Sequence, residues 1–143
     1  MPRFGSAAVA ALALAVYLLL APAVSGMGDG SELTLVLATN GVAHPTGYPL
    51  YTLVGHLFCR ALHALGATWP YAANAWSAVG GAVAIFFLHA LASRLVDPSV
   101  ATGAGARFAA ALLPVALLAF NPILLGEATS AEVNSWNLAI CCG

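Results

Sequence analysis

The sequence predicts an all-α protein that crosses a membrane several times. Of its 143 residues, 62% are hydrophobic and only 6% are charged, and the mean hydropathy is +0.93. A soluble domain carries roughly 25% charged residues, so this chain has too few to cover a surface that faces water. Lipid is therefore the expected solvent. The net charge of −1 and the absence of a basic run in the sequence argue against a nucleic-acid partner.

Three apolar runs are long enough to span a bilayer, which takes about 20 mostly apolar residues. We predict spans at residues 7–24, 72–96 and 108–125, and the start of a fourth at 133–143. The first run follows Arg3 and ends in APAVSG, which also fits a secretory signal peptide with its cleavage site. We favour an uncleaved helix, because the run exceeds a typical signal-peptide core and further spans follow.

The arginines predict the orientation of these spans. If the spans alternate, Arg3, Arg94 and Arg107 fall on one side, which the positive-inside rule makes cytoplasmic. Residues 25–71 then form a long outer loop, and residues 97–106 form a short cytoplasmic one. Four of the five acidic residues lie on the outer face, namely Asp29, Glu32, Glu127 and Glu132.

The outer loop is expected to contain two short helices joined by a rigid turn. The first helix opens at Asp29 or Ser31 and ends near Asn40, where an Asn-Gly pair is a C-cap signal. The turn AHPTGYP follows, with two prolines that fix φ and a glycine that reaches conformations closed to other residues. We expect this turn to hold His44 near Asp29 and Glu32.

The second helix is expected from Pro49 to Gly66, with proline in its first turn and glycine just past its end. Its apolar residues share one face, which is typical of a helix lying in the membrane interface. The opposite face is polar and contains Thr52, His56, Cys59, Arg60 and His63. A metal site built on His56, Cys59 and His63 would lack a fourth ligand, so we favour a solvated polar face and predict no metal site.

Four strings carry a family resemblance: GDGSEL, GVAHPTGYPLYTLVGHLF, ANAWSAVGGAVA and LGEATSAEVNSWNL. They resemble the start of the GT-C-type protein O-mannosyltransferase-like membrane proteins. The first outer loop of that family carries an Asp and a Glu in a D-S-G-E-L-like string, followed by H-P-x-G-Y-P-L. Both acids match here with the middle pair swapped, and the H-P-x-G-Y-P-L match is complete. Asn134 departs from the family's E-V-Y, because it replaces the aromatic residue.

The resemblance implies the N-terminal fragment of a GT-C-like enzyme with a long first outer loop. Such enzymes take a sugar from a polyprenyl-phosphate donor and place it on a Ser or Thr hydroxyl of an acceptor protein. Asp29 would be the general base or position the acceptor, with Glu32 as its partner. The expected donor- or substrate-binding residues are His44, Tyr48, Arg60, Glu127 and Glu132. The lipid-linked sugar takes the place of a cofactor, and a requirement for a divalent metal stays open.

Each of these residues also has a purely structural interpretation. Asp29 and Glu32 have the spacing of a capping box, in which both side chains bond the start of a helix. His44 could simply hydrogen-bond the turn, and Tyr48 could be an interface aromatic. Arg60 could hold the headgroup of an anionic lipid instead of the donor phosphate.

Two broader alternatives concern the whole protein. Glu127 and Glu132 could be solvated loop acids, and the protein could be a non-catalytic membrane subunit or a transporter with an acid-lined pathway. We expect a multi-pass integral membrane protein in contact with membrane lipids. The alanine-rich composition favours a bacterial inner membrane over the endoplasmic reticulum.

Overall fold

The computed structural model describes residues 2–26, 28–45, 47–97, 99 and 101–143, and these residues form helices and no strand. The helices are α1 (Pro2–Leu20), α2 (Asp29–Thr39), α3 (Pro49–Ala64), α4 (Trp69–Leu95), α5 (Ala104–Ala119), α6 (Pro122–Thr129) and α7 (Asn134–Cys142). The predicted all-α class is thus confirmed. The side chain of Arg3, on which part of the predicted orientation rests, lies outside the described part.

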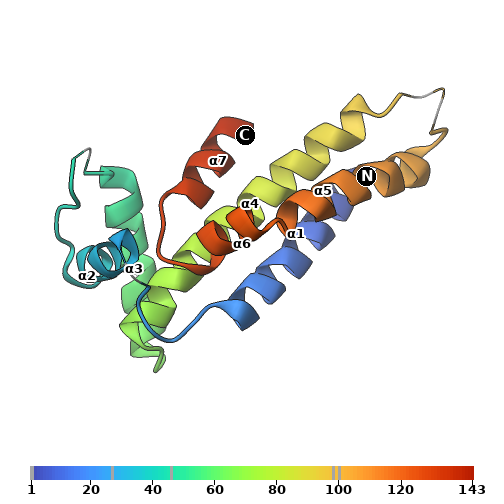
Figure 1. Ribbon diagram of the computed structural model, residues 1–143. Helices are drawn as coiled ribbons and strands as arrows, with labels where there is room; N and C mark the ends of the chain where they lie inside the picture. The colour runs from blue at the N-terminus through green and yellow to red at the C-terminus, as the bar shows by residue number, and fades with distance from the viewer. Residues whose placement is uncertain (1, 27, 46, 98, 100) are drawn as a thin grey trace.

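The longest helix, α4, organises the fold (Figure 1). Its 27 residues extend about 40 Å at 1.5 Å per residue. Helices α1, α5, α6 and α7 pack along it, and α2 and α3 lie against the end that begins at Trp69. Thr68 caps this end, because its side chain accepts a hydrogen bond from the Tyr71 N–H.

Small residues let the other helices approach α4 closely. The buried ones are Ala72, Ala73, Ala75, Ala78, Gly80, Gly81, Ala82 and Ala84. A Cβ added at Gly81 would lie 2.8 Å from Ala128 Cβ and 3.1 Å from the Tyr17 ring. The Tyr17 hydroxyl donates to the Ala119 carbonyl at 2.8 Å, which ties α1 to α5. Close contacts through small residues are typical of helices packed in lipid, where burial from water contributes little.

The predicted span 72–96 is found as α4, whose best window has a mean hydropathy of 1.7. The run 108–125 differs from the prediction. It is divided between α5 and α6, which are bent by 69° at the break. The sequence carries the cause, because Asn121 accepts from the Ile123 N–H at 2.9 Å and Pro122 occupies the first helical position. In the described part, one helix can cross a membrane by length and composition, or two if the bent pair is one span.

The other two predicted runs also form helices. Helix α1 ends at Leu20, short of the predicted boundary at residue 24, because Pro22 follows and cannot continue a helix. Helix α7 occupies the fourth run. The residues from Phe4 to Leu20 form an apolar helix shorter than a full span. Repeated crossing of a membrane therefore remains a prediction.

Helix α3 begins at the predicted residue, but part of its polar face is buried against the protein and does not face water. The predicted apolar face is exposed, with Leu50 at 76% and Leu57 at 59%. Thr52 and Cys59 are instead buried against the protein, so the prediction of a solvated polar face is wrong for these positions. The reason is that this face of α3 packs against α2 and α4, where Cys59 joins a cluster with Leu37 and Ala73. Burial also raises the pKa of the Cys59 thiol to about 12.

Candidate functional site

The site begins at the first turn of α2. Asp29 is the first residue of this helix, and Gly28 precedes it with φ +70°. The Ser31 hydroxyl donates to the Gly28 carbonyl at 2.8 Å. Neither carboxylate caps the helix, so the capping-box interpretation of Asp29 and Glu32 is wrong. The two acids instead project from the positive end of the helix dipole, where negative charge is favoured.

Glu32 is engaged by the turn that follows α2. Its Oε1 accepts from the His44 backbone N–H at 2.8 Å and lies 3.1 Å from His44 Nδ1. These hydrogen bonds favour the charged carboxylate and lower the pKa of Glu32. The predicted proximity of His44 to this acid is confirmed.

The turn itself is shaped by backbone conformations that few residues adopt. Gly47 has φ +82° and Tyr48, directly before α3, has φ +42°. The Gly47 N–H donates to the His44 carbonyl at 2.9 Å, and the Tyr48 ring lies edge-on to the His44 ring at 6.0 Å between centroids. Non-glycine residues pay strain for positive φ, which often marks a functional site. Thr46 in the same turn lies outside the described residues.

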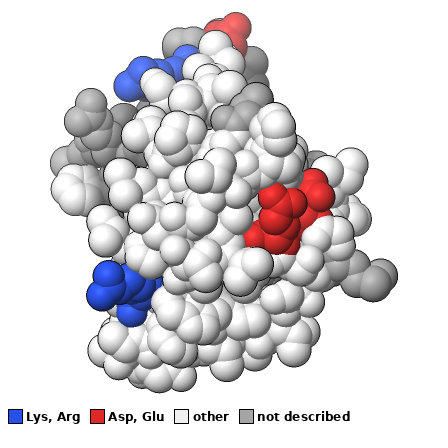
Figure 2. Space-filling model, turned by 90° about the vertical axis from the view of Figure 1, so that its left-hand side faces the viewer, with Lys and Arg blue, Asp and Glu red and all other residues white. Residues whose placement is uncertain are grey.

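Glu132 reaches the same place from the segment between α6 and α7. Its backbone is fixed by Ser77 of α4, whose Oγ accepts from the Glu132 N–H at 3.0 Å and donates to its carbonyl at 2.9 Å. Partial burial and then the nearby charges of Glu127 and Asp29 raise the pKa of Glu132, while His44 acts in the opposite direction. The four predicted outer-face acids therefore gather, and Figure 2 shows an acidic patch on this end of the molecule.

Glu127 joins the group from α6. Its Oε2 accepts from the Asn134 side-chain amide at 2.8 Å, which ties the end of α6 to the start of α7. Asn134 is the residue that departs from the family's E-V-Y string. We call Asp29, Glu32, His44, Glu127 and Glu132 the acidic site.

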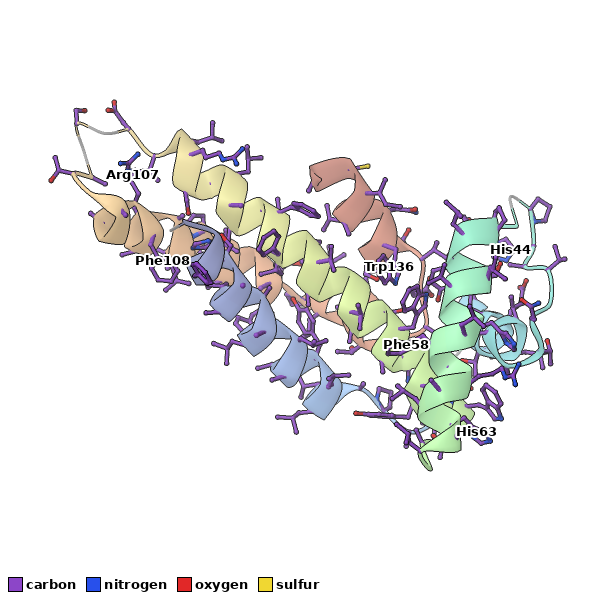
Figure 3. All side chains as sticks on the ribbon, turned by 180° about the vertical axis from the view of Figure 1, so that it is seen from behind. His44, Phe58, His63, Arg107, Phe108 and Trp136 are labelled. Carbon is purple, nitrogen blue, oxygen red and sulfur yellow. The ribbon has the colours of Figure 1, made fainter. Side chains whose placement is uncertain are left out.

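An apolar groove of about 470 Å³ lies beside the acidic site. Ten residues from α3, α4, α7 and their flanks line it, namely Tyr48, Pro49, Leu50, Tyr51, Val54, Trp76, Val133, Trp136, Asn137 and Ile140. Trp136, which is labelled in Figure 3, donates from Nε1 to the Trp76 carbonyl at 2.9 Å. The centroids of the two rings lie 4.2 Å apart. The buried Tyr51 hydroxyl has no hydrogen-bond partner among the described residues.

Sequence reasoning did not predict this groove. Trp76 and Trp136 lie within the predicted spans 72–96 and 133–143, and only the family strings that contain them give a signal for a site. Ser77 lies within the predicted span 72–96, and nothing in the local sequence indicates that it fixes the backbone of Glu132.

The structure does not bring Arg60 to the acidic site. Arg60 lies 11 residues after Pro49 on α3, which corresponds to about 16 Å along the helix axis. The histidines of α3 have partners outside the acidic site. His56 Nδ1 lies 2.7 Å from the Leu37 carbonyl of α2, and the His63 ring stacks on the Trp69 ring at 4.3 Å between centroids. Among the described residues, no group of three His, Cys, Asp or Glu side chains could hold a metal.

Comparison with known proteins agrees with the motifs. The family described as "Protein O-mannosyl-transferase TMEM260 N-terminal domain" matches residues 29–142. A protein O-mannosyl-transferase TMEM260 from Mus musculus is 33% identical over 133 residues, which are 93% of this chain and 17% of that protein. A protein O-mannosyl-transferase tmem260 from Dictyostelium discoideum is 39% identical over 70 residues, which are 48% of this chain and 8% of that protein.

The chain thus spans less than a fifth of the length of either relative. Both organisms are eukaryotes, so these relatives give no support to the expected bacterial inner membrane. No solved structure gives a significant match. The family match extends over most of the chain and includes every residue of the acidic site. The chain therefore belongs to the family of the TMEM260 N-terminal domain.

Proposed function

We propose that this chain is the N-terminal part of a multi-pass membrane glycosyltransferase of the GT-C type. The enzyme would transfer a sugar, mannose by the names of the relatives, from a polyprenyl-phosphate donor to a Ser or Thr hydroxyl of an acceptor protein. The reaction would take place on the outer or lumenal face. The observation that carries this proposal is the gathering of carboxylates and a histidine beside an apolar, aromatic-lined groove.

Asp29 is suited to be the general base. Its side chain is exposed and makes no hydrogen bond to another described residue, whereas Glu32 is engaged by His44. As the acceptor oxygen bonds to the anomeric carbon, its proton passes to the Asp29 carboxylate. The bond from that carbon to the phosphate oxygen breaks, and its electron pair leaves with the polyprenyl phosphate. Nearby negative charge stabilises the oxocarbenium-like transition state.

The other acidic residues would orient the donor and the acceptor. Glu32 orients His44 through two contacts, and a histidine at this place can donate to an oxygen of the donor phosphate or the acceptor. The raised pKa of Glu132 keeps its proton to higher pH than an ordinary glutamate. Glu132 lies beside Asp29 and can form hydrogen bonds with the hydroxyl groups of the bound sugar.

The groove would receive the first isoprene units of the donor. Its walls are mainly aromatic and aliphatic, and Leu50 and Val54 continue them onto the exposed apolar face of α3. This continuity would let an apolar tail pass from the groove into lipid. The buried Tyr51 hydroxyl, which lies near the Ser77 side chain, can supply a hydrogen-bond donor at the wall of the groove.

The test is Asp29→Asn in the full-length protein, assayed for mannose transfer from a polyprenyl-phosphate donor to a Ser/Thr peptide. We expect transfer to fall at least about 100-fold, because a positioned general base contributes roughly 10²–10⁴. Asp97→Asn is the matched control, since Asp97 is exposed at the far end of α4, and it should retain normal transfer. Undiminished transfer by Asp29→Asn at equal expression would remove Asp29 from the mechanism and favour the transporter or subunit alternative.

A second test addresses the side of the membrane. In a full-length protein whose native cysteines, Cys59, Cys141 and Cys142 among them, are all replaced by serine, a single cysteine at position 29 should react with an impermeant maleimide from the outer or lumenal side. Reaction from the cytosol alone would separate the acids from the lumenal donor and contradict the proposal.

A further inference from the structure

A second cavity lies at the other end of α4, far along the molecule from His44 (Figure 3). It measures about 390 Å³ and is formed by the start of α1, the end of α4 and the start of α5. Its lining residues are Gly5, Ser93, Arg94, Ala104, Gly105, Arg107 and Phe108. None of these residues belongs to the acidic site or to the apolar groove.

Two arginines line this cavity, and the Arg107 Nε–H donates to the Gly103 carbonyl at 3.5 Å. Neither Arg94 nor Arg107 forms an ion pair with a carboxylate of the described part. The acid nearest in sequence is Asp97, whose Oδ1 accepts from the Ser99 N–H at 2.7 Å. Two unpaired positive charges on one cavity repel each other unless an anion lies between them, and forked guanidinium donors suit a phosphate.

The backbone at the start of α5 adds further positive potential. Gly103 precedes this 16-residue helix with φ +96°, and no side chain caps it. The cavity is lined by Ala104 and Gly105 of the first turn, where helical N–H groups have no partner within the helix. A Cβ added at Gly105 would meet no atom within 4 Å, so the space in front of these groups is open.

One wall of the cavity is apolar. The Phe108 ring covers Gly5 so closely that a Cβ added at Gly5 would lie 2.7 Å from it. The ring also lies 4.9 Å from the buried His89 ring, measured between centroids. The cavity therefore combines a cationic mouth with a hydrocarbon wall. A free inorganic anion uses only the first of these features, whereas a phospholipid headgroup with its glycerol uses both.

We propose that this cavity binds the phosphate of an anionic phospholipid headgroup. The guanidinium groups of Arg94 and Arg107 hold the phosphate oxygens, and the Ser93 hydroxyl and the first turn of α5 complete the polar surround. The glycerol and upper acyl carbons lie along Phe108. This binding does not depend on sugar transfer at the opposite end of the molecule.

The experiment uses the full-length protein in a neutral detergent, titrated with phosphatidylglycerol that carries a fluorescent acyl chain. We expect saturable binding that unlabelled phosphatidylglycerol displaces and phosphatidylcholine displaces at least tenfold less well. The double variant Arg94→Gln/Arg107→Gln should lower the affinity at least tenfold. Gly105→Leu should lower it similarly, because it fills the cavity without changing the charge. The matched control Ala106→Leu, at an exposed neighbouring position outside the lining, should stay within twofold of the unmodified protein.

Three results would overturn the proposal. Phosphatidylglycerol affinity that survives Gly105→Leu would indicate diffuse attraction to charge. Equal displacement by phosphatidylcholine would remove the requirement for an anionic headgroup. Displacement by glycerol phosphate at the same concentrations as the lipid would assign the site to a soluble phosphate ester. Mannose transfer measured on the same variants keeps this test separate from that of Asp29.

Discussion

The acidic site at the Trp69 end of α4 and the arginine-lined cavity at its Leu95 end are assembled in different ways. The acidic site joins α2, the His44 turn and the segment between α6 and α7, and hydrogen bonds between residues 12 and 55 positions apart fix it. The arginine-lined cavity depends mainly on the consecutive helices α4 and α5, and its open space lies in front of short side chains. Chemistry needs fixed geometry, whereas the capture of a lipid headgroup needs charge and room.

The first prediction tests this difference in packing by adding a single methyl group near each of the two sites along α4. Gly80→Ala would place a Cβ 2.8 Å from the Trp136 ring and 2.9 Å from Ser135 Oγ, so α7 must move away from α4. Overpacking of this kind costs about 1–3 kcal/mol of folding free energy. Gly105→Ala meets nothing and should be neutral or stabilise α5 by up to about 1 kcal/mol.

Denaturant-induced unfolding of the two full-length variants in detergent would measure this contrast. Trp136 fluorescence should change in Gly80→Ala alone, because its ring lines the groove. Equal stability of the two variants would mean that the acidic end is no more tightly packed than the arginine end.

The second comparison uses two serines of α4. Ser77→Ala removes both hydrogen bonds to the Glu132 backbone and should cost about 1 kcal/mol of folding free energy. It should also slow mannose transfer, because Glu132 is no longer held beside Asp29. Ser93→Ala loses only a long contact of 3.5 Å to His89 Nδ1 and should leave stability nearly unchanged. Thermal unfolding and the peptide assay on both variants would check this. A larger loss of stability or of mannose transfer in Ser93→Ala than in Ser77→Ala would contradict this prediction.

The sequence predicted much of this difference through charge and turn chemistry. The arginine pattern predicted that the four acids share one face of the membrane, and the structure brings them near one another. The turn chemistry of the prolines and Gly47 predicted His44 beside Glu32, which the structure confirms. These features are local or follow from one global rule, so they can be read without knowing the packing. The family string was the strongest evidence for the acidic site as a whole.

The features that the sequence did not predict depend on tertiary contacts, that is, on which other helix or loop packs against a given residue. The helical period of α3 identified its two faces correctly, but it could not tell that Cys59 would face α2 and α4 rather than water. The role of Ser77 could not be predicted, because its partner Glu132 lies 55 positions away in the sequence. The break between α5 and α6 was different. Asn121-Pro122 is a recognisable helix start, which the apolar composition of the run concealed.

The smallest expected effect is that of acidification. At each end of α4, one acidic side chain accepts a hydrogen bond from a backbone N–H. Glu32 accepts from His44, 12 positions away, and Asp97 accepts from Ser99, two positions away. Hydrogen bonds to the charged form lower the pKa of both carboxyls. Because the pKa is lowered, each hydrogen bond stabilises the folded state at pH values above the ordinary pKa of its carboxyl group. This contribution is lost as the pH falls through the lowered value.

The consequences at the two ends should nevertheless differ. As the pH falls from 4.5, the ordinary value for glutamate, through the lowered pKa of Glu32, protonation of this carboxyl should release the His44 turn from α2. Hydrogen exchange should then show a falling protection factor for the His44 amide, and Glu32→Gln should remove this pH dependence. Protonation of Asp97 should affect only the Ser99 amide, since the bond closes a turn of two residues. A His44 protection factor that stays constant through this range would show that Pro45 and Gly47 hold the turn without Glu32, and the acidic site would then be preformed by its backbone.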